Sequence, residues 1–275
     1  MLKNSFYFIV RCGLAEQIIR AIFAYKIMKK YPNKEIYFET TFFKLHKKTK
    51  HEIFLLDKFK IFNELGGKKI MLSENEFKEF KNYGQFKKIY QQDFFCDMEA
   101  DKKNTFHNQE LPFLFYKYFH SNSIKFIKKN LTLVNELLEL TVPLNTENKN
   151  MLQLIKQSQN SVCVHVRRGD IWGGPKQQEY FLSKIKKMAH KLKTNLNLFI
   201  FSNDIKWCKE NIKSNVHNIT YVTINDEIHP HFELTLMKNC QHFIVSTGQF
   251  GYLAAILSQN KGKIVLKDRL YNYIK

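Results

Sequence analysis

One short segment joins an apolar run to a cluster of charged and polar side chains. Residues 161–170 read Ser-Val-Cys-Val-His-Val-Arg-Arg-Gly-Asp, and the valines and Cys163 have the pattern of a buried β-strand. Arg167 and Arg168 follow directly, and a guanidinium at the end of a buried strand needs an acidic partner or a bound anion. The carboxyl edge of an open α/β sheet is where ligands bind. The segment therefore predicts a pocket for a phosphorylated ligand, with a structural ion pair to Asp170 as the alternative.

Two other apolar runs also end in short polar residues. The first ends in Phe-Ser-Asn-Asp at 201–204, where Asn203 and Asp204 can accept from a base or a sugar. Asp204 can instead cap the next helix. The second ends in Ser-Thr-Gly-Gln at 246–249, which predicts either a phosphate cradle at a helix start or an ordinary Ser/Thr cap. Because three strand ends carry such groups together, the sequence predicts a nucleotide-phosphate site.

The elements that position these groups follow from the hydrophobic periodicity of the C-terminal half. Strands alternate with amphipathic helices there, which predicts a parallel, Rossmann-like sheet. The predicted strands are 162–167, 196–202, 219–223, 242–246 and 263–266, and the predicted helices are 151–159, 177–193, 205–212, 231–240 and 249–258.

The N-terminal half opens in the same way. A strand at 6–10, a helix at 17–30 and a strand at 36–38 predict a βαβ unit. A polar stretch with a proline at 142–150 predicts a boundary between an acceptor-side domain, 1–150, and a nucleotide-binding domain, 151–275. The predicted class is α/β, with two Rossmann-like domains facing each other across a cleft. Further helical stretches are predicted at 52–64, 74–81, 111–119 and 123–140.

The composition restricts partners and compartment. The chain has 275 residues and a formal net charge of +19, which favours a polyanion, an anionic membrane or a phosphorylated substrate, with solvated lysine-rich faces as the alternative. The five cysteines lie far apart, which predicts a reducing compartment. No run reaches the ~18 apolar residues of a membrane span. We therefore expect a cytoplasmic protein, with peripheral contact to the cytoplasmic membrane as an option.

Motifs for a metal-held nucleotide are absent from the sequence. It contains neither a Gly-x-x-x-x-Gly-Lys-Ser/Thr loop nor an Asp-x-Asp pair. His229, His231 and Glu233 could hold a metal, but their spacing around a proline favours capping of a helix. We therefore expect no metal.

Four stretches together resemble a known enzyme family. Residues 165–170 meet a His-x-Arg-Arg-x-Asp motif, and 201–208 match a Phe-Ser-Asp-Asp…Trp-Cys stretch. Residues 233–237 match an acidic-Leu-x-Leu-Met segment, and 12–17 echo a Gly-Gly-Leu-Gly-Asn-Gln opening. On these motifs the chain resembles bacterial α-1,2-fucosyltransferases of glycosyltransferase family 11.

The resemblance implies a GT-B-like fold and an inverting, metal-independent transfer from GDP-fucose, with no cofactor. It implies that Arg167 and Arg168 hold the β-phosphate, a role that suits the negative charge developing on leaving GDP. With the strand-end analysis, it predicts a substrate-binding set of His165, Asp170, Asn203, Asp204, Ser246, Thr247, Gly248, Gln249, Gly13 and Gln17.

The chain departs from the family pattern at several positions. Thr-Gly-Gln-Phe-Gly-Tyr-Leu stands at 247–253 where the family has Asn-Ser-Ser-Phe-Ser-Trp-Trp, and Asn203 replaces an aspartate. Another GDP-sugar, such as a heptose, therefore remains an alternative donor. Glu16 replaces an asparagine and could deprotonate the acceptor hydroxyl as a general base; the alternative is a helix N-terminal charge favoured by the dipole.

The predicted function is transfer of fucose to a hydroxyl of a surface glycan precursor, such as a lipid-linked oligosaccharide or a lipooligosaccharide. No nucleic-acid partner is expected under this interpretation. The alternatives from other classes are a basic nucleic-acid-binding protein without catalysis and a degenerate transferase fold that binds a glycan.

Overall fold

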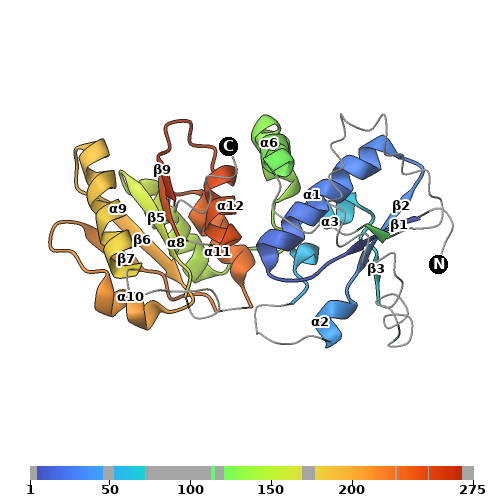
Figure 1. Cartoon of the computed structure of the whole chain (residues 1–275), viewed down its shortest axis with the longest axis horizontal. Helices are drawn as coiled ribbons and strands as arrows, with labels where there is room; N and C mark the ends of the chain where they lie inside the picture. Colours follow the sequence, from blue (N-terminus) through green and yellow to red (C-terminus); the bar gives the residue numbers. More distant parts are fainter. Residues whose placement is uncertain are drawn as a thin grey trace. The chain divides into compact units, whose positions relative to one another are not determined.

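The computed structural model describes residues 5–45, 53–71, 73, 113–114, 121–168, 177–226, 228–246 and 248–267. The chain forms two compact units (Figure 1). Unit 1 comprises Met1–Phe126 with Glu136–Thr141, and unit 2 comprises Ile127–Asn135 with Val142–Lys275. The roles predicted for 1–150 and 151–275, and the way in which the two halves face each other, stay predictions.

Unit 1 contains a four-stranded parallel sheet in the order β3-β2-β1-β4. The predicted βαβ opening is confirmed, because β1 and β2 pair in parallel and α1 lies between them in the chain. Most residues of α1 are buried, and isoleucine, alanine and phenylalanine are the commonest among them. The elements are β1 (Ser5–Ile9), α1 (Leu14–Lys30), β2 (Glu35–Glu39), α2 (Thr41–Leu45), β3 (Lys69–Ile70) and β4 (Phe113–Leu114).

The helix predicted at 52–64 is interrupted. A 3-10 turn, η1 (Leu56–Lys58), and a short helix, α3 (Lys60–Glu64), flank Phe59, whose backbone is extended. Phe59 forms an antiparallel bridge with Leu140, so a long-range backbone contact replaces continuation of the helix.

Two other helix predictions also need correction. The stretch predicted at 123–140 divides into α6 (Ser121–Lys129) and α7 (Leu131–Leu137). The helix predicted at 111–119 is wrong at Phe113–Leu114, which pair with β1 as a strand. The rest of that stretch, and the helix predicted at 74–81, lie outside the described residues.

Unit 2 contains a five-stranded parallel sheet in the order β7-β6-β5-β8-β9, which confirms the predicted alternation. The helix predicted at 151–159 begins earlier, because Asn145 accepts from the backbone N–H of Asn148 and caps it. The strands are β5 (Ser161–Val166), β6 (Asn197–Ser202), β7 (Asn218–Tyr221), β8 (His242–Val245) and β9 (Val265–Lys267). The helices are α8 (Thr146–Gln157), α9 (Gln177–Leu192), α10 (Ile205–Asn211), α11 (Pro230–Lys238) and α12 (Gln249–Leu257).

The core of unit 2 explains the apolar run that precedes the arginines. Val162, Val164 and Val166 pack on one side of β5 with Phe181 and other side chains of α9. Alternate residues of a strand point to opposite faces, so Cys163 and His165 point to the other side. Cys163 and Cys240 are buried, as expected for small core residues. No helix in the described part of the chain is long and apolar enough to cross a membrane.

Candidate functional site

The strand order of unit 2 reverses between β5 and β8. From β5 the chain builds outward through β6 and β7, and it then returns to the other side of β5 to add β8 and β9. Such a reversal point is where open α/β sheets bind ligands at their carboxyl edge. Both strands end there in predicted site residues, and the two ends are joined. Ser246 Oγ accepts from the Arg167 N–H at 3.0 Å, and the Ser246 N–H donates to the His165 carbonyl at 3.1 Å.

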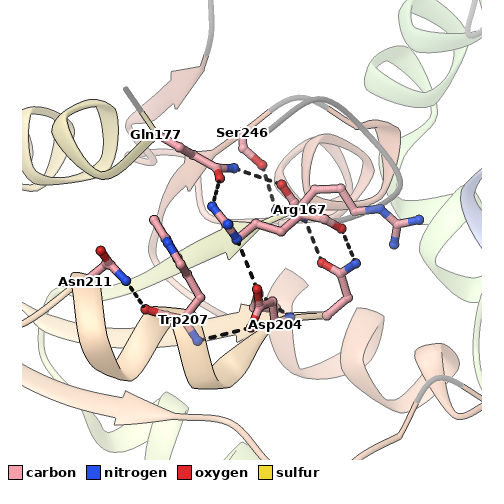
Figure 2. A network of polar contacts seen from close by, with 9 residues as sticks. Arg167, Gln177, Asp204, Trp207, Asn211 and Ser246 are labelled. Carbon is pink, nitrogen blue, oxygen red and sulfur yellow. Dashed lines mark hydrogen bonds and ion pairs between the residues drawn. The ribbon is translucent and has the colours of Figure 1, made fainter. Parts of the chain in front are cut away.

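Arg168 contacts three side chains that Figure 2 labels, those of Gln177, Asp204 and Trp207. Its Nε donates to Asp204 Oδ2 at 3.1 Å and its Nη1 donates to Gln177 Oε1 at 2.6 Å. Its guanidinium carbon lies 4.0 Å from the centroid of the Trp207 ring, a cation–π contact. Arg168 therefore forms a structural ion pair, but with Asp204; the pair with Asp170 raised by the sequence stays a prediction. Asp170 lies outside the described residues.

Asn203 and Asp204 join the end of β6 to this network. Asn203 accepts from the Arg168 N–H through Oδ1 at 2.9 Å and donates through Nδ2 to the Arg168 carbonyl. Asp204 Oδ1 accepts from the Trp207 N–H at 3.1 Å, so Asp204 also caps α10. Both residues have internal partners, and their binding of a donor base or sugar stays a prediction.

Arg167 has a different orientation. Its backbone takes part in the network, because its carbonyl accepts from Gln177 Nε2 at 2.9 Å. Its guanidinium extends away from the Arg168 network (Figure 2). Its Cγ lies close to Gly248, where an added Cβ would be 3.6 Å away. Of the two adjacent arginines, Arg167 is therefore the one whose charged group points away from the internal contacts of Arg168.

The helix that follows β8 has a glycine at its N-cap position. Gly248 has φ +113°, a backbone conformation that favours glycine, and as a glycine it supplies no side-chain capping bond to α12. Its first backbone N–H groups include that of Gln249. Uncapped N–H groups at a helix start are suited to an anion. Thr247 lies outside the described residues.

His165 is buried and 5 % exposed. Burial, with a contribution from the charge of Arg167, lowers its pKa to about 3, so the ring is neutral at physiological pH. The ring meets the edge of Phe250, with the two centroids 5.9 Å apart. The described contacts of His165 are thus internal, and its predicted role in binding substrate stays a prediction.

The candidates from the N-terminal half lie at the start of α1 in unit 1. Glu16 Oε2 is 3.5 Å from Nη2 of Arg20, whose side chain is only 2 % exposed. Gly13 occupies the N-cap position of α1. Gln17 is fully buried: its Oε1 accepts from the Leu55 N–H at 2.9 Å, and its Nε2 donates to the carbonyls of residues 53 and 12. Gln17 therefore joins α1 to the segment that precedes η1.

Sequence reasoning left two contacting residues out of the site. Gln177 bridges the backbone of Arg167 and the guanidinium of Arg168, and nothing in its sequence context predicts this. Trp207 belongs to a family motif, but its stacking on Arg168 was not predicted. Glu233 has no printed contact with this network; burial, and then the charge of Asp226, raise its pKa to about 8.

The His-Pro-His stretch shows no metal site. Within the described ranges, no group of three or more His, Cys, Asp or Glu side chains is arranged to hold a metal ion. His229 instead pairs with Asp226 at 2.6 Å and stacks on Phe232. It stands at the N-cap position of α11 without a side-chain capping bond, so the predicted capping is positional only.

Comparison with known proteins identifies the family. The model of glycosyl transferase family 11 matches residues 5–273. The chain belongs to this family. The human galactoside alpha-(1,2)-fucosyltransferase 1 is 31% identical over 104 residues, 35% of this chain and 28% of that protein. The alpha-1,2-colitosyltransferase of Escherichia coli is 28% identical over 135 residues, 44% of this chain and 45% of that protein. The chain thus matches less than half the length of these relatives.

The solved structures support the same fold class. NodZ alpha-1,6-fucosyltransferase, co-crystallised with GDP, superposes with a TM-score of 0.58 at 10% identity and covers 94% of this chain and 93% of that one. This family member therefore has the α/β, GT-B-like fold that its sequence predicts.

Proposed function

We propose that the protein transfers fucose from GDP-fucose to a glycan hydroxyl, with an α-1,2 linkage, inversion at the anomeric carbon and no metal. The observation that carries the proposal is the geometry at the end of β5. Arg167 directs its guanidinium away from the Arg168 network, and its side chain lies beside Gly248 at the start of α12. A guanidinium and a set of backbone N–H groups together suit a diphosphate.

The chemistry follows from the charge that the reaction creates. When the sugar–phosphate bond breaks, the leaving GDP gains negative charge on its β-phosphate. The Arg167 guanidinium and the backbone N–H groups at Gln249 would offset that charge. Arg168 and Gln177 would hold the Arg167 backbone in place and would not themselves contact the donor.

Glu16 is the proposed general base in the acceptor half. Its carboxylate lies 3.5 Å from the buried Arg20 guanidinium in the first turn of α1, and a carboxylate is a group that can accept a proton. The same contact also suits the alternative, a structural charge in the first turn of α1. The double variant Glu16→Gln with Arg20→Met removes both charges, and so it separates the catalytic role of Glu16 from the structural one.

The acceptor and its location are part of the proposal. We expect a surface glycan precursor such as a lipid-linked oligosaccharide, because a net charge of +19 favours peripheral contact with anionic lipid. A second donor sugar is supported by one finding: a matching relative is named an alpha-1,2-colitosyltransferase, so colitose is the alternative to fucose.

Calorimetric titration of GDP, GDP-fucose and GDP-mannose without metal tests the proposal. We expect micromolar GDP binding that Arg167→Ala abolishes with little change in Tm. Arg168→Ala should instead lower stability by about 1–2 kcal/mol, because it disrupts the network with Asp204 and Gln177. Lys206→Ala, an exposed position on α10, is the control for loss of one charge.

Two results would contradict this assignment. Unchanged GDP affinity in folded Arg167→Ala would remove Arg167 from the donor site. Failure of the wild-type protein to bind any GDP compound would reject the transferase, and the nucleic-acid alternative would then predict salt-dependent binding to nucleic acid.

A further inference from the structure

The first turn of α12 lies directly against the ring of His165. A Cβ atom added to Gly251 would stand 2.6 Å from His165 Cγ and Nδ1 and 2.7 Å from its Cβ. Those separations are far below van der Waals contact, so no side chain fits at Gly251 unless the helix or the ring moves.

Helix propensity does not account for this glycine. Gly251 lies inside α12, among buried residues from Tyr252 to Leu257 that include two alanines. A glycine inside a helix costs about 0.5–1 kcal/mol relative to alanine. Its φ is not in the left-handed region, so the backbone does not require glycine either. In this chain the close approach of His165 is the feature that requires glycine, at a position where the family pattern given above has a serine.

A second approach to the β5 segment occurs one turn earlier, at an ordinary van der Waals distance. Gly248 lies three residues before Gly251, and its missing Cβ would meet Arg167 Cγ at 3.6 Å. His165 and Arg167 are two residues apart and so point to the same side of the chain leaving β5. The two glycines therefore place α12 against two successive side chains of the β5 segment.

The ring of His165 acts here as a spacer. It is buried, and among the described residues its Nδ1 has no hydrogen-bond partner. Phe250 meets it edge-on from the same helix. The ring therefore fills the space between β5 and α12 by packing, and its width sets how far the helix stands from the strand.

We propose that Gly251 is a positioning residue for donor binding: by seating α12 on His165, it fixes the separation between Arg167 and the N–H groups at the helix start. The inference rests on the proposed function, in which these two groups bind one diphosphate. A ligand held by both depends on their distance, because hydrogen bonds to a charged group, worth about 1.5–3 kcal/mol each, weaken when donor and acceptor are displaced.

Gly251→Ala tests this in the whole 275-residue chain. We expect the affinity for GDP to fall by roughly tenfold to a hundredfold in calorimetry, the loss that follows when a hydrogen bond to a charged ligand is broken, measured on protein with an unchanged near-UV circular dichroism spectrum. Gly262→Ala is the matched control, because its Cβ would lie at an ordinary 3.7 Å from Asn260 Oδ1, and it should keep wild-type affinity.

A second substitution separates positioning from general loss of structure. His165→Ala removes the ring that a Cβ at position 251 would strike, so the double variant should bind GDP more tightly than Gly251→Ala alone. A role limited to stability would lower Tm without this rescue of affinity. Wild-type affinity in folded Gly251→Ala, or no rescue by His165→Ala, would overturn the inference while leaving the proposed function intact. Absence of GDP binding by the wild-type protein would overturn both.

Discussion

Buried Arg20 changes how the general-base hypothesis for Glu16 must be tested. Arg20 is among the largest fully buried side chains, and Glu16 is its ion-pair partner at 3.5 Å. Removing one partner of a buried pair leaves an uncompensated charge, which typically costs several kcal/mol. A loss of activity in a Glu16 variant could therefore arise from the fold as easily as from the chemistry.

We predict that Glu16→Gln lowers the free energy of unfolding by about 2–4 kcal/mol, because Arg20 loses its counter-charge. Glu16→Gln combined with Arg20→Met should recover most of that stability, since neither charge then remains. Urea denaturation measures both variants. If the double variant is stable yet inactive, Glu16 acts in catalysis. Near-normal turnover in the double variant would leave only the structural role.

Glu233 predicts an unusual dependence of stability on pH. Its pKa is about 8 in the folded protein, against 4.5 for an ordinary glutamate. The folded state therefore keeps a proton that the unfolded state loses, so the contribution of Glu233 to stability is present below pH 4.5 and is lost as pH rises to about 8.

Glu233→Gln isolates this effect. The variant should be more stable than the wild type at pH 8 and equally stable near pH 4, measured by urea denaturation. His165 contributes to stability with the opposite dependence on pH, but both proteins contain it, so its contribution cancels in the comparison. The pKa of that group falls from 6.5 to about 3 on folding, so its contribution is lost as pH falls through this range. A difference between the two proteins that does not change with pH would contradict the assignment.

At the scale of elements, Gln17 explains how an irregular segment is held against α1. Its amide satisfies one backbone N–H and two backbone carbonyls that no regular structure pairs. The residue belongs to a family motif, which predicts a role in binding substrate. Its described contacts give it a structural role, as a bond between α1 and the segment at Leu55.

We predict that Gln17→Ala lowers the free energy of unfolding by about 1–3 kcal/mol, because it leaves the buried Leu55 N–H without its partner. GDP affinity should stay unchanged, because the proposed donor groups lie in unit 2. Gln157→Ala, at the exposed end of α8, is the control and should be neutral. Loss of GDP affinity in folded Gln17→Ala would favour the substrate-binding role.

Periodicity predicted the regular elements well and their interruptions poorly. The alternation in unit 2 follows from local patterns, such as the valines of β5 and the apolar positions of α9. The break at Phe59 and the strand at Phe113–Leu114 depend on pairing with distant backbone. Because those partners are remote in the sequence, the periodicity of the neighbouring residues cannot predict the pairing.

At the scale of the whole molecule, a net charge of +19 implies self-repulsion in the compact state. We predict that Tm rises by a few degrees when NaCl increases from about 10 to 200 mM, because salt screens this repulsion. Replacing the exposed lysines of α9 with glutamine should weaken the effect; these are Lys186, Lys187 and Lys191. A fall of Tm with salt would show that attractive ion pairs dominate.

The sequence by itself determined the class of the fold, the strand that leads to the arginines and the family to which the chain belongs. These depend on local periodicity and on short motifs, which can be read without knowing how the chain folds. Tertiary structure alone decided the difference between Arg167 and Arg168, since residues as distant as Gln177 and Asp204 hold the guanidinium of Arg168. It also decided the requirement for Gly251, because only packing brings α12 onto the ring of His165.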